Sequence, residues 1–575
     1  MIFRPLAISS VVFLLGGHDS ALSVRPLSGG RAAAPIAPSP VLAAMQQELT
    51  RSMETLKTRP LPAYFLSYAI TDRRSVTVRG AFGTLAASSD TRVRTLGVDL
   101  RVGSSRFDNT HAIRGGLPSM DAADRFSMAQ VPIDDEPLAI RRVLWYQTDT
   151  KYKRAVERYT RAKANTQVLV AAEDSSADFS LEPAASYTEA PASVAVDRKA
   201  WEAKIRRYTA PFAQVDGIYD ADATLMAQQE TRWYVNSDGS ALQMSSVLFR
   251  LMITANSKAA DGMVMPRYET YLSTTAAGLP DDAAVLKAVQ RMIADLQALK
   301  QAPVVEAITT PAILSGRASG VFFHEVFGHR VEGHRQKVET EGQTFKKMLG
   351  QKLLPDAFSV YFDPTLRRIG NIELAGSFAY DDEGVKARRI NVVENGVFKN
   401  FLMSRSPIAG FDHSNGHGRA QPGFAPVARQ SNLVVTSSAA VSRDSLKKML
   451  LGLVKEQHKP YGLIFDDIEG GFTMTQRTLP NAFNVLPIMV YRVFPDGREE
   501  LVRGVDLVGT PLTVFSRVVA ADNVTSVFNG ICGAESGGVP VSASSPAVLL
   551  SQIEVQRKAK SQDQAPILPM PRVQP

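Results

Sequence analysis

Residues 320–336, GVFFHEVFGHRVEGHRQ, hold three of the eight histidines of the chain. His324 and Glu325 open this stretch as the metal-binding helix of a zinc protease opens, but that helix carries its second histidine four residues after the first. Here His329 follows His324 by five residues, which places the two side chains roughly 140° apart on a regular α-helix. Two imidazoles that diverge so far cannot share one ion. A metal site therefore predicts a distorted helix, for example a π-bulge, at or near Gly328.

The neighbours of this motif favour burial. Apolar side chains surround it: Val321, Phe322, Phe323, Val326 and Phe327. Buried His and Glu side chains are costly without a partner, and a metal ion would supply one. A His-Glu-x-x-x-His pattern arises by chance on the order of 0.01 times in a chain of this composition. The competing interpretation is a helix whose histidines face solvent or satisfy hydrogen bonds in the core.

A second pair, His329 and His334, is also five residues apart. It is a formal alternative ligand set, but no glutamate follows its first histidine, which favours the pair formed by His324 and His329. The sequence identifies no side chain that stabilises an oxyanion. His334, His413 and His417 are candidates for that role, and surface or structural roles are favoured for each of them.

The N-terminus has the pattern of a secretory signal. Arg4 precedes an apolar run from Leu6 to Leu15, and small residues follow near Ala21. We therefore expect a signal peptide at 1–23, a flexible spacer at 24–44 and export to the periplasm or the cell exterior. No later segment approaches the ~20 apolar residues that a membrane helix needs, so stable membrane insertion is not expected.

If the chain is exported, its single cysteine, Cys532, lies in an oxidising compartment. It cannot form an internal disulfide, and a free thiol is a liability in an oxidising compartment unless it is buried or bound to metal. The formal charge of +8 and the pI near 9.3 come from basic residues that alternate with acidic ones along most of the chain. This pattern favours a general surface property over nucleic-acid binding.

The elements that must position these residues predict an α+β fold with two domains. Residues 45–304 form an N-terminal α/β domain with antiparallel strands, and 305–555 form a largely antiparallel β domain with the histidine helix inserted. The main helices are expected at 40–57, 138–164 and 281–300.

Turn residues and composition mark the rest of the chain. Asn-Gly at 395–396 and Asp-Gly at 496–497 predict two β-hairpins in the C-terminal domain. The acidic stretch 171–196 reads as a surface loop. Residues 556–575 are rich in Pro and Gln, which predicts a disordered tail.

Several motifs together resemble the TldD/PmbA family of metalloproteases. SGVFFHEVFGHRVEG is similar to the signature of active members, in which a Glu-Gly pair, here Glu332 and Gly333, follows the second histidine. SNGHGRAQPGFAPVARQSNLVV resembles a Gly-rich segment that ends in Arg-x-x-Asn, here Arg429 to Asn432. GGFTMTQRTLPNAFNVLPIMVYRVFPDGREELVRGVDLVGTP resembles the paired strands that follow, and FNGICGAESGGVPVSASSPAVLL the C-terminal Cys-Gly segment. The motifs cover roughly 305–555 in family order.

The resemblance implies a zinc site formed by His324, His329 and Cys532, with Glu325 as general base. Three protein ligands leave a fourth position for water, which becomes acidic enough for Glu325 to take its proton before attack on a peptide carbonyl. Glu325 then returns the proton to the leaving amine. The resemblance also implies a homo- or heterodimer with a TldD/PmbA-like subunit, and unfolded or extended peptides as substrates.

Two other interpretations compete with this zinc peptidase. One is a noncatalytic peptide-binding or scaffold member of the family that keeps the metal for structure. The other is an unrelated cell-envelope protein whose motifs are accidental. Closed four-ligand coordination favours the noncatalytic member, because catalysis needs an open position. Cys532 within ligand reach of both histidines excludes the accidental motif.

Overall fold

A computed structural model gives the structure of the chain. It describes residues 39–113, 129–168, 174–476 and 483–558, together with 566, 568 and 571. The predicted signal peptide lies outside the described residues, so export stays a prediction. Helix α1 begins at Pro40, inside the range predicted as spacer, and strand β24 ends at Arg557, inside the range predicted as tail. The rest of both ranges lies almost wholly outside the described residues.

Helices and antiparallel sheets share the described residues, which confirms the α+β prediction. The helices are α1 (Pro40–Leu56), α3 (Pro137–Val168), α4 (Arg198–Thr209), α5 (Asp282–Gln301), α6 (Gly316–Val326), α7 (Arg443–Glu456) and α8 (Pro511–Phe515). The predicted helices at 40–57, 138–164 and 281–300 correspond to α1, α3 and α5. None of these helices, within the part of the chain that is described, is long and apolar enough to cross a membrane.

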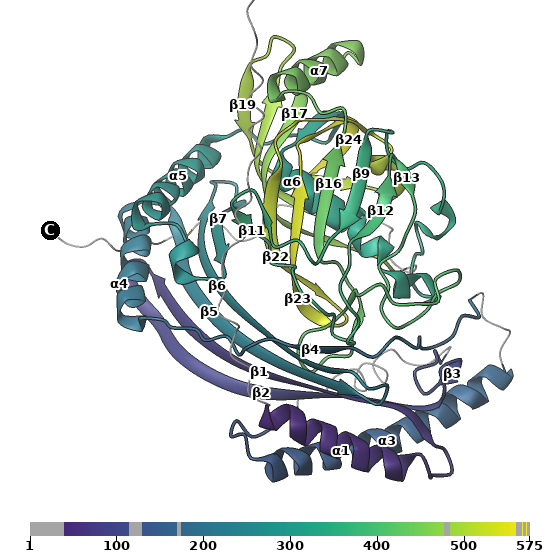
Figure 1. Cartoon of the computed structure of the whole chain (residues 1–575). Helices are drawn as coiled ribbons and strands as arrows, with labels where there is room; N and C mark the ends of the chain where they lie inside the picture. Colours follow the sequence, from purple (N-terminus) through teal and green to yellow (C-terminus); the bar gives the residue numbers. More distant parts are fainter. Residues whose placement is uncertain are drawn as a thin grey trace, which may run out of the picture. The chain divides into compact units, whose positions relative to one another are not determined.

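The N-terminal part is built on one sheet of long strands. Its strands are β1 (Ala63–Ala81), β2 (Thr84–Ser104), β3 (Phe107–Asp108), β4 (Ser186–Thr188), β5 (Ile218–Asn236), β6 (Ala241–Lys258) and β7 (Val264–Ser273). They run in the order β3-β2-β1-β5-β6-β4, and β7 also pairs with β6. Figure 1 shows α1 and α3 side by side along the long strands, where they share a buried core with β1, β2 and β5.

The period of two along β1 gives this sheet two different faces. Leu66, Tyr68 and Ile70 are buried in the core beneath α1 and α3. Ser67 and Ala69, between them in sequence, line a cavity on the opposite face. One face of the sheet therefore stabilises the fold, while the other is available to a site.

Two further sheets form the C-terminal part. The first has the order β13-β12-β9-β16-β23-β22. Its strands are β9 (Phe358–Phe362), β12 (Ile390–Glu394), β13 (Val397–Phe398), β16 (Asn432–Ser437), β22 (Ser526–Ala534) and β23 (Gly537–Ser545). Two short ribbons, β10 (Arg368–Ile369) with β11 (Ile372–Glu373) and β14 (Gly418–Arg419) with β15 (Val427–Ala428), are separate from it. Both C-terminal sheets are largely antiparallel, as predicted; β16 with β23 is one of the parallel pairs.

The second C-terminal sheet has the order β17-β8-β24-β20-β18-β19, and β21 pairs with β24. Its strands are β8 (Ile308–Leu314), β17 (Gly462–Thr473), β18 (Phe483–Val493), β19 (Glu499–Val502), β20 (Val505–Gly509), β21 (Val518–Ala521) and β24 (Val548–Arg557). β17 pairs with β18 as well as with β8, so these strands close on themselves. Both predicted hairpins are confirmed: Asn395 and Gly396 have positive φ between β12 and β13, and Gly497 turns the chain between β18 and β19.

Helix α6 lies between these two C-terminal sheets, in contact with β17 and β18 on one side and with β22 and β23 on the other. Its apolar residues Val321, Phe322, Phe323 and Val326 belong to the main C-terminal core. The histidine motif is therefore buried, as its apolar neighbours predict.

The prediction of a surface loop at 171–196 is wrong for part of the stretch. Asp174, Asp178 and Phe179 are buried, and Ser180 accepts hydrogen bonds from the guanidinium of Arg405 at 2.8 and 3.0 Å. The sequence lacks the apolar periodicity of a core element because this segment is held by polar contacts with a distant loop instead.

Candidate metal centre

The backbone around Gly328 explains how two histidines five residues apart can lie close together. Regular helix ends at Val326, and residues Gly328–Val331 form a 3₁₀ turn. The distortion predicted near Gly328 is present, but its form differs from the predicted π-bulge. A Cβ at Gly328 would overlap the side chain of Gln430, so glycine is needed there for the close approach of another segment.

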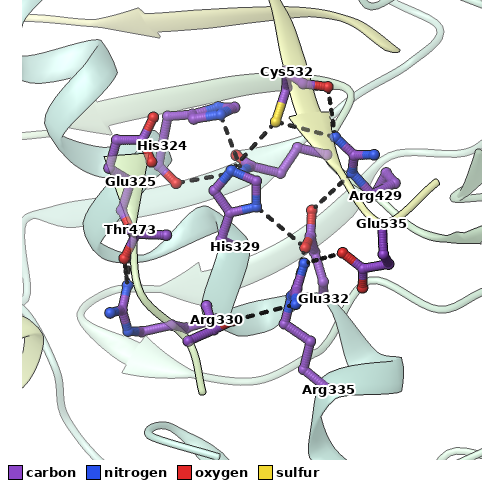
Figure 2. A network of polar contacts seen from close by, with 12 residues as sticks. His324, Glu325, His329, Arg330, Glu332, Arg335, Arg429, Thr473, Cys532 and Glu535 are labelled. Carbon is purple, nitrogen blue, oxygen red and sulfur yellow. Dashed lines mark hydrogen bonds and ion pairs between the residues drawn. The ribbon is translucent and has the colours of Figure 1, made fainter. Parts of the chain in front are cut away.

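His324 on α6, His329 on the 3₁₀ turn and Cys532 on β22 converge (Figure 2). Their candidate ligand atoms all lie within 4.8 Å of one another, and all three residues are buried. Cys532 Sγ lies 3.3 Å from His329 Nε2. Two ligand atoms of a tetrahedral zinc site with these bond types lie about 3.6 Å apart. Two imidazoles and a thiolate thus fit zinc in donor chemistry, and the separation of Cys532 and His329 is close to the one zinc needs.

Charge in this cluster favours the metal-binding form of the cysteine. Burial works against the thiolate, but His329 and His324 outweigh it and hold the pKa of Cys532 well below its usual range. Burial also opposes protonation of His329, yet Cys532 and Glu332 together raise the pKa of this imidazole well above its usual range. The pair behaves as an ion pair, and a thiolate is the form that a metal ion binds.

Glu325 lies beside these residues in the wall of the same cavity and is 6% exposed. Burial raises the pKa of its carboxyl, against the opposing effect of His324 and His329. Its backbone carbonyl accepts a hydrogen bond of 2.9 Å from Arg330, which fixes the end of α6. A buried carboxyl with a raised pKa suits a group that first accepts and then returns a proton.

A cavity of about 1410 Å³ opens in front of the three candidate ligands. It is lined by β1, β2 and β5 of the N-terminal sheet, by β17 and β22, and by the loop after β14. Two exposed apolar side chains, Phe472 on β17 and Ile531 on β22, are among its lining residues. The cavity is large enough to admit a stretch of polypeptide.

The other candidate histidines lie outside the cluster of described metal-ligating side chains. His334 forms an ion pair with Glu535. His417 is fully buried, with Nε2 3.1 Å from Ser431 Oγ, and burial lowers its pKa to about 3. His413 is exposed, 3.5 Å from Glu182. His417 and His413 thus have a structural and a surface role. His334 lines the cavity beside the candidate ligands but pairs with Glu535 and lies outside the ligand cluster, which does not support the pair His329 and His334.

Sequence reasoning missed the roles of Glu332 and Arg429. Both belong to the motifs that carry the family resemblance, but neither spacing nor composition indicates what they contact. In the structure both are fully buried beside the candidate ligands. The sequence shows a glutamate and an arginine in these motifs, but it does not show that the two pair, because they lie about a hundred positions apart.

Comparison with known proteins agrees with this geometry. The family model described as the PmbA/TldA metallopeptidase C-terminal domain matches residues 308–557. The chain is 28% identical over 230 residues to a metalloprotease of Methanocaldococcus jannaschii, which covers 40% of this chain and 47% of that protein. It is 25% identical over 248 residues to a zinc metalloprotease TldD homolog of Saccharolobus solfataricus, covering 43% of this chain and 51% of that protein. The chain thus spans about half the length of these curated relatives.

Solved structures share the fold over most of the chain. TldE from Thermococcus kodakarensis aligns with a TM-score of 0.57 and 14% identity, covering 89% of this chain and all of that one. A Thermotoga maritima protein described as a modulator of a DNA gyrase aligns with a TM-score of 0.59 and 15% identity, covering 89% and 99%. Residues 308–557 thus carry the C-terminal domain of the TldD/PmbA family, and the solved structures share the fold over most of the chain. Its relatives at low identity are named metalloproteases, and its buried His-His-Cys group fits a metal.

Proposed function

We propose that the chain is a zinc-dependent peptidase that hydrolyses peptide bonds of unfolded or extended peptides. One observation carries the proposal. Two histidines and the single cysteine, drawn from segments about two hundred residues apart, converge beside Glu325 in the wall of a large cavity. A structural cluster alone gives no reason for Glu325 to border that cavity.

His324, His329 and Cys532 would hold the zinc. When bound, zinc would lower the pKa of a water molecule and polarise a peptide carbonyl. Glu325 would accept the proton of the attacking water and return it to the leaving amine. The described metal-ligating cluster contains three protein donors, which favours an open position over the closed coordination of a noncatalytic scaffold member.

Strand β22 supports the choice of extended peptides. It carries Cys532, and in the sheet formed by the described strands it pairs only with β23 and stands at the edge. An edge strand presents unpaired N–H and C=O groups to which an extended peptide can add with little side-chain selectivity. A peptide bound along β22 would pass the three candidate ligands.

The proposal includes a second subunit and export. The structural likeness to TldE favours a TldD/PmbA-like partner, in a homo- or heterodimer. The basic start and apolar run of residues 1–23 favour a periplasmic or extracellular location.

The test combines metal analysis with cleavage of an unfolded peptide, with and without a chelator. Wild-type protein should hold about one zinc per chain and lose activity with the metal. Glu325→Gln should keep zinc and lose about 10²- to 10⁴-fold in rate, the range that a general base supplies. Glu469→Gln, which removes an exposed carboxylate of the same cavity, is the matched control and should stay near wild type.

Each alternative has its own outcome. Full activity of Glu325→Gln would exclude the proposed mechanism. Zinc without cleavage in the wild type would favour the noncatalytic scaffold member of the family. A wild-type protein that binds no zinc and cleaves no peptide would exclude the function as a whole.

A further inference from the structure

Arg429 is a fully buried arginine in the loop between β15 and β16. Removing a guanidinium from water costs several kcal/mol unless other groups compensate it. The residues that compensate Arg429 therefore indicate what this side chain does. Neither catalysis nor metal binding as described above uses it.

One edge of the guanidinium contacts Cys532 on β22 (Figure 2) and the turn that follows this strand. Nη2 donates to Cys532 Sγ at 3.2 Å and to the Cys532 carbonyl at 2.6 Å. Nη1 donates to Ser536 Oγ at 2.8 Å and to the Gly537 carbonyl at 3.0 Å. Arg429 thus binds the end of β22, the start of β23 and the thiol itself.

The other edge of Arg429 faces Glu332, with Nε 3.4 Å from Glu332 Oε1. Glu332 Oε2 lies 3.2 Å from His329 Nδ1 and accepts a 2.9 Å hydrogen bond from Arg335. With Arg335 bound to one carboxylate oxygen and Arg429 beside the other, the carboxylate of Glu332 is held in place and can orient the imidazole.

Together these contacts form a continuous chain, Cys532–Arg429–Glu332–His329. His329 faces Cys532 with Nε2, and the chain reaches the same imidazole at Nδ1, on the other side of the ring. A metal-bound histidine usually has its second ring nitrogen fixed by a carboxylate or carbonyl, and such partners change metal affinity 10- to 100-fold. Cys532 lies on an edge strand, which has only one neighbouring strand to hold it in place.

We infer that Arg429 is a positioning residue that, through Glu332, sets Cys532 and His329 at the separation that zinc requires. The inference rests on the proposed zinc site and adds to it the residues that preorganise it. The competing role is charge compensation, in which Arg429 merely neutralises buried acidic groups. The two roles differ in what a substitution does to metal affinity when Cys532 is absent.

Arg419 supplies a matched control. It is a buried arginine of the neighbouring β14, where it donates to the Gln430 carbonyl at 2.5 Å and lies over the ring of Phe378. Among the described residues, no hydrogen bond joins Arg419 to Cys532, in contrast to Arg429. Arg419→Gln therefore removes one positive charge near the thiolate without removing the hydrogen bonds to it.

The experiment measures the zinc affinity of the purified full chain by competition with a chelator of known affinity. Arg429→Gln should weaken binding about 10- to 100-fold. Arg429→Lys keeps the charge but lacks the fork that reaches both Glu332 and Cys532, so it should lose about 10-fold. Arg419→Gln should stay within about 3-fold of wild type. Cobalt-substituted Arg429→Gln should show a weaker thiolate-to-metal charge-transfer band.

A double-mutant cycle separates positioning from general stability. In a Cys532→Ala background, residue 532 no longer supplies a ligand for Arg429 to position, so Arg429→Gln should cost less than about 3-fold in affinity. An equal loss in both backgrounds, or equal losses for Arg429→Gln and Arg419→Gln, would overturn the inference. If Arg429→Gln does not fold, the same comparisons are made with Arg429→Lys.

The outcomes also separate this inference from the proposed function. Wild-type protein that binds no zinc removes the function and the inference together. Wild-type protein that binds zinc tightly, with Arg429→Gln and Arg429→Lys binding equally tightly, removes the inference alone.

Discussion

Gly320→Ala tests whether the distance between α6 and its sheet sets the geometry of the metal centre. Gly316, Gly320 and His324 follow one another at intervals of four, so they share one face of α6. That face meets β22 and β23. A Cβ at Gly320 would lie 2.8 Å from the carbonyl oxygen of Ala543 on β23, whereas ordinary contacts begin at 3.4 Å.

The expected size of the effect follows from these distances. The Ala543 oxygen is backbone and cannot rotate away, so α6 must move from the sheet by roughly 0.6 Å. Metal–ligand distances tolerate about 0.2 Å. The shift carries His324 away from Cys532 on the neighbouring strand, and zinc affinity should fall at least about 10-fold. Overpacking costs about 1–3 kcal/mol and alanine regains about 1 kcal/mol in helix propensity, which leaves a net loss of about 0–2 kcal/mol.

Denaturant unfolding of the metal-free protein gives the stability change, and chelator competition gives the affinity. Gly452→Ala is the control, because Gly452 lies exposed in α7 with no atom within 4 Å of an added Cβ. This control should gain about 0.5–1 kcal/mol and keep its zinc affinity. A Gly320→Ala protein with wild-type affinity would refute the link between helix–sheet distance and the metal centre. A gain in its stability would refute the packing argument.

Two further predictions concern buried charges away from the candidate ligands. Burial raises the pKa of Asp381 to about 6 and, together with Asp381, that of Glu383 to about 8. The folded chain then binds protons that the unfolded chain releases near pH 4, so the stabilising contribution of these two carboxyls is fully present below about pH 4 and is lost as pH rises to about 8. Glu383→Gln should remove most of that slope between pH 5 and 8 in urea unfolding, and an unchanged slope would contradict the assignment. Arg267 bridges Asp467 at 2.9 Å and Asp295 at 3.0 Å. Arg267→Ala should cost about 3 kcal/mol in the same assay, and a loss below about 1 kcal/mol would show that solvent already screens these pairs.

Local signals in the sequence predicted much of the fold. Asn395 and Gly396 adopt the positive φ of a two-residue turn, which side-chain chemistry alone favours. The apolar stripe of α5 follows from a period of 3.6 residues, and both ends of the helix lie within one residue of the predicted range. Both features depend on neighbours in sequence, which is why they could be read from it.

Features that depend on distant segments could not be predicted in the same way. The spacing of His324 and His329 showed that a regular helix cannot direct both imidazoles at one ion. It did not distinguish a π-bulge from the helix end and 3₁₀ turn that occur. Phe179 lies beneath the guanidinium of Arg405, more than two hundred residues away, and Asp178 contacts His111 and Lys337. The contact of Arg429 with Cys532 likewise joins positions with no mutual pattern in the sequence.

The edge position of β22 places two opposing demands on Cys532. In the proposed peptidase, the outer edge of β22 must stay unpaired so that an extended peptide can add to it. An edge strand is held by one neighbour instead of two, so a metal ligand on it is less firmly placed than one in the middle of a sheet. Arg429 meets both demands because it binds the Cys532 carbonyl and thiol from the protein interior and leaves the outer edge open. A buried cation can therefore take the place of the missing neighbouring strand, and this explains why an arginine is placed where its burial is costly.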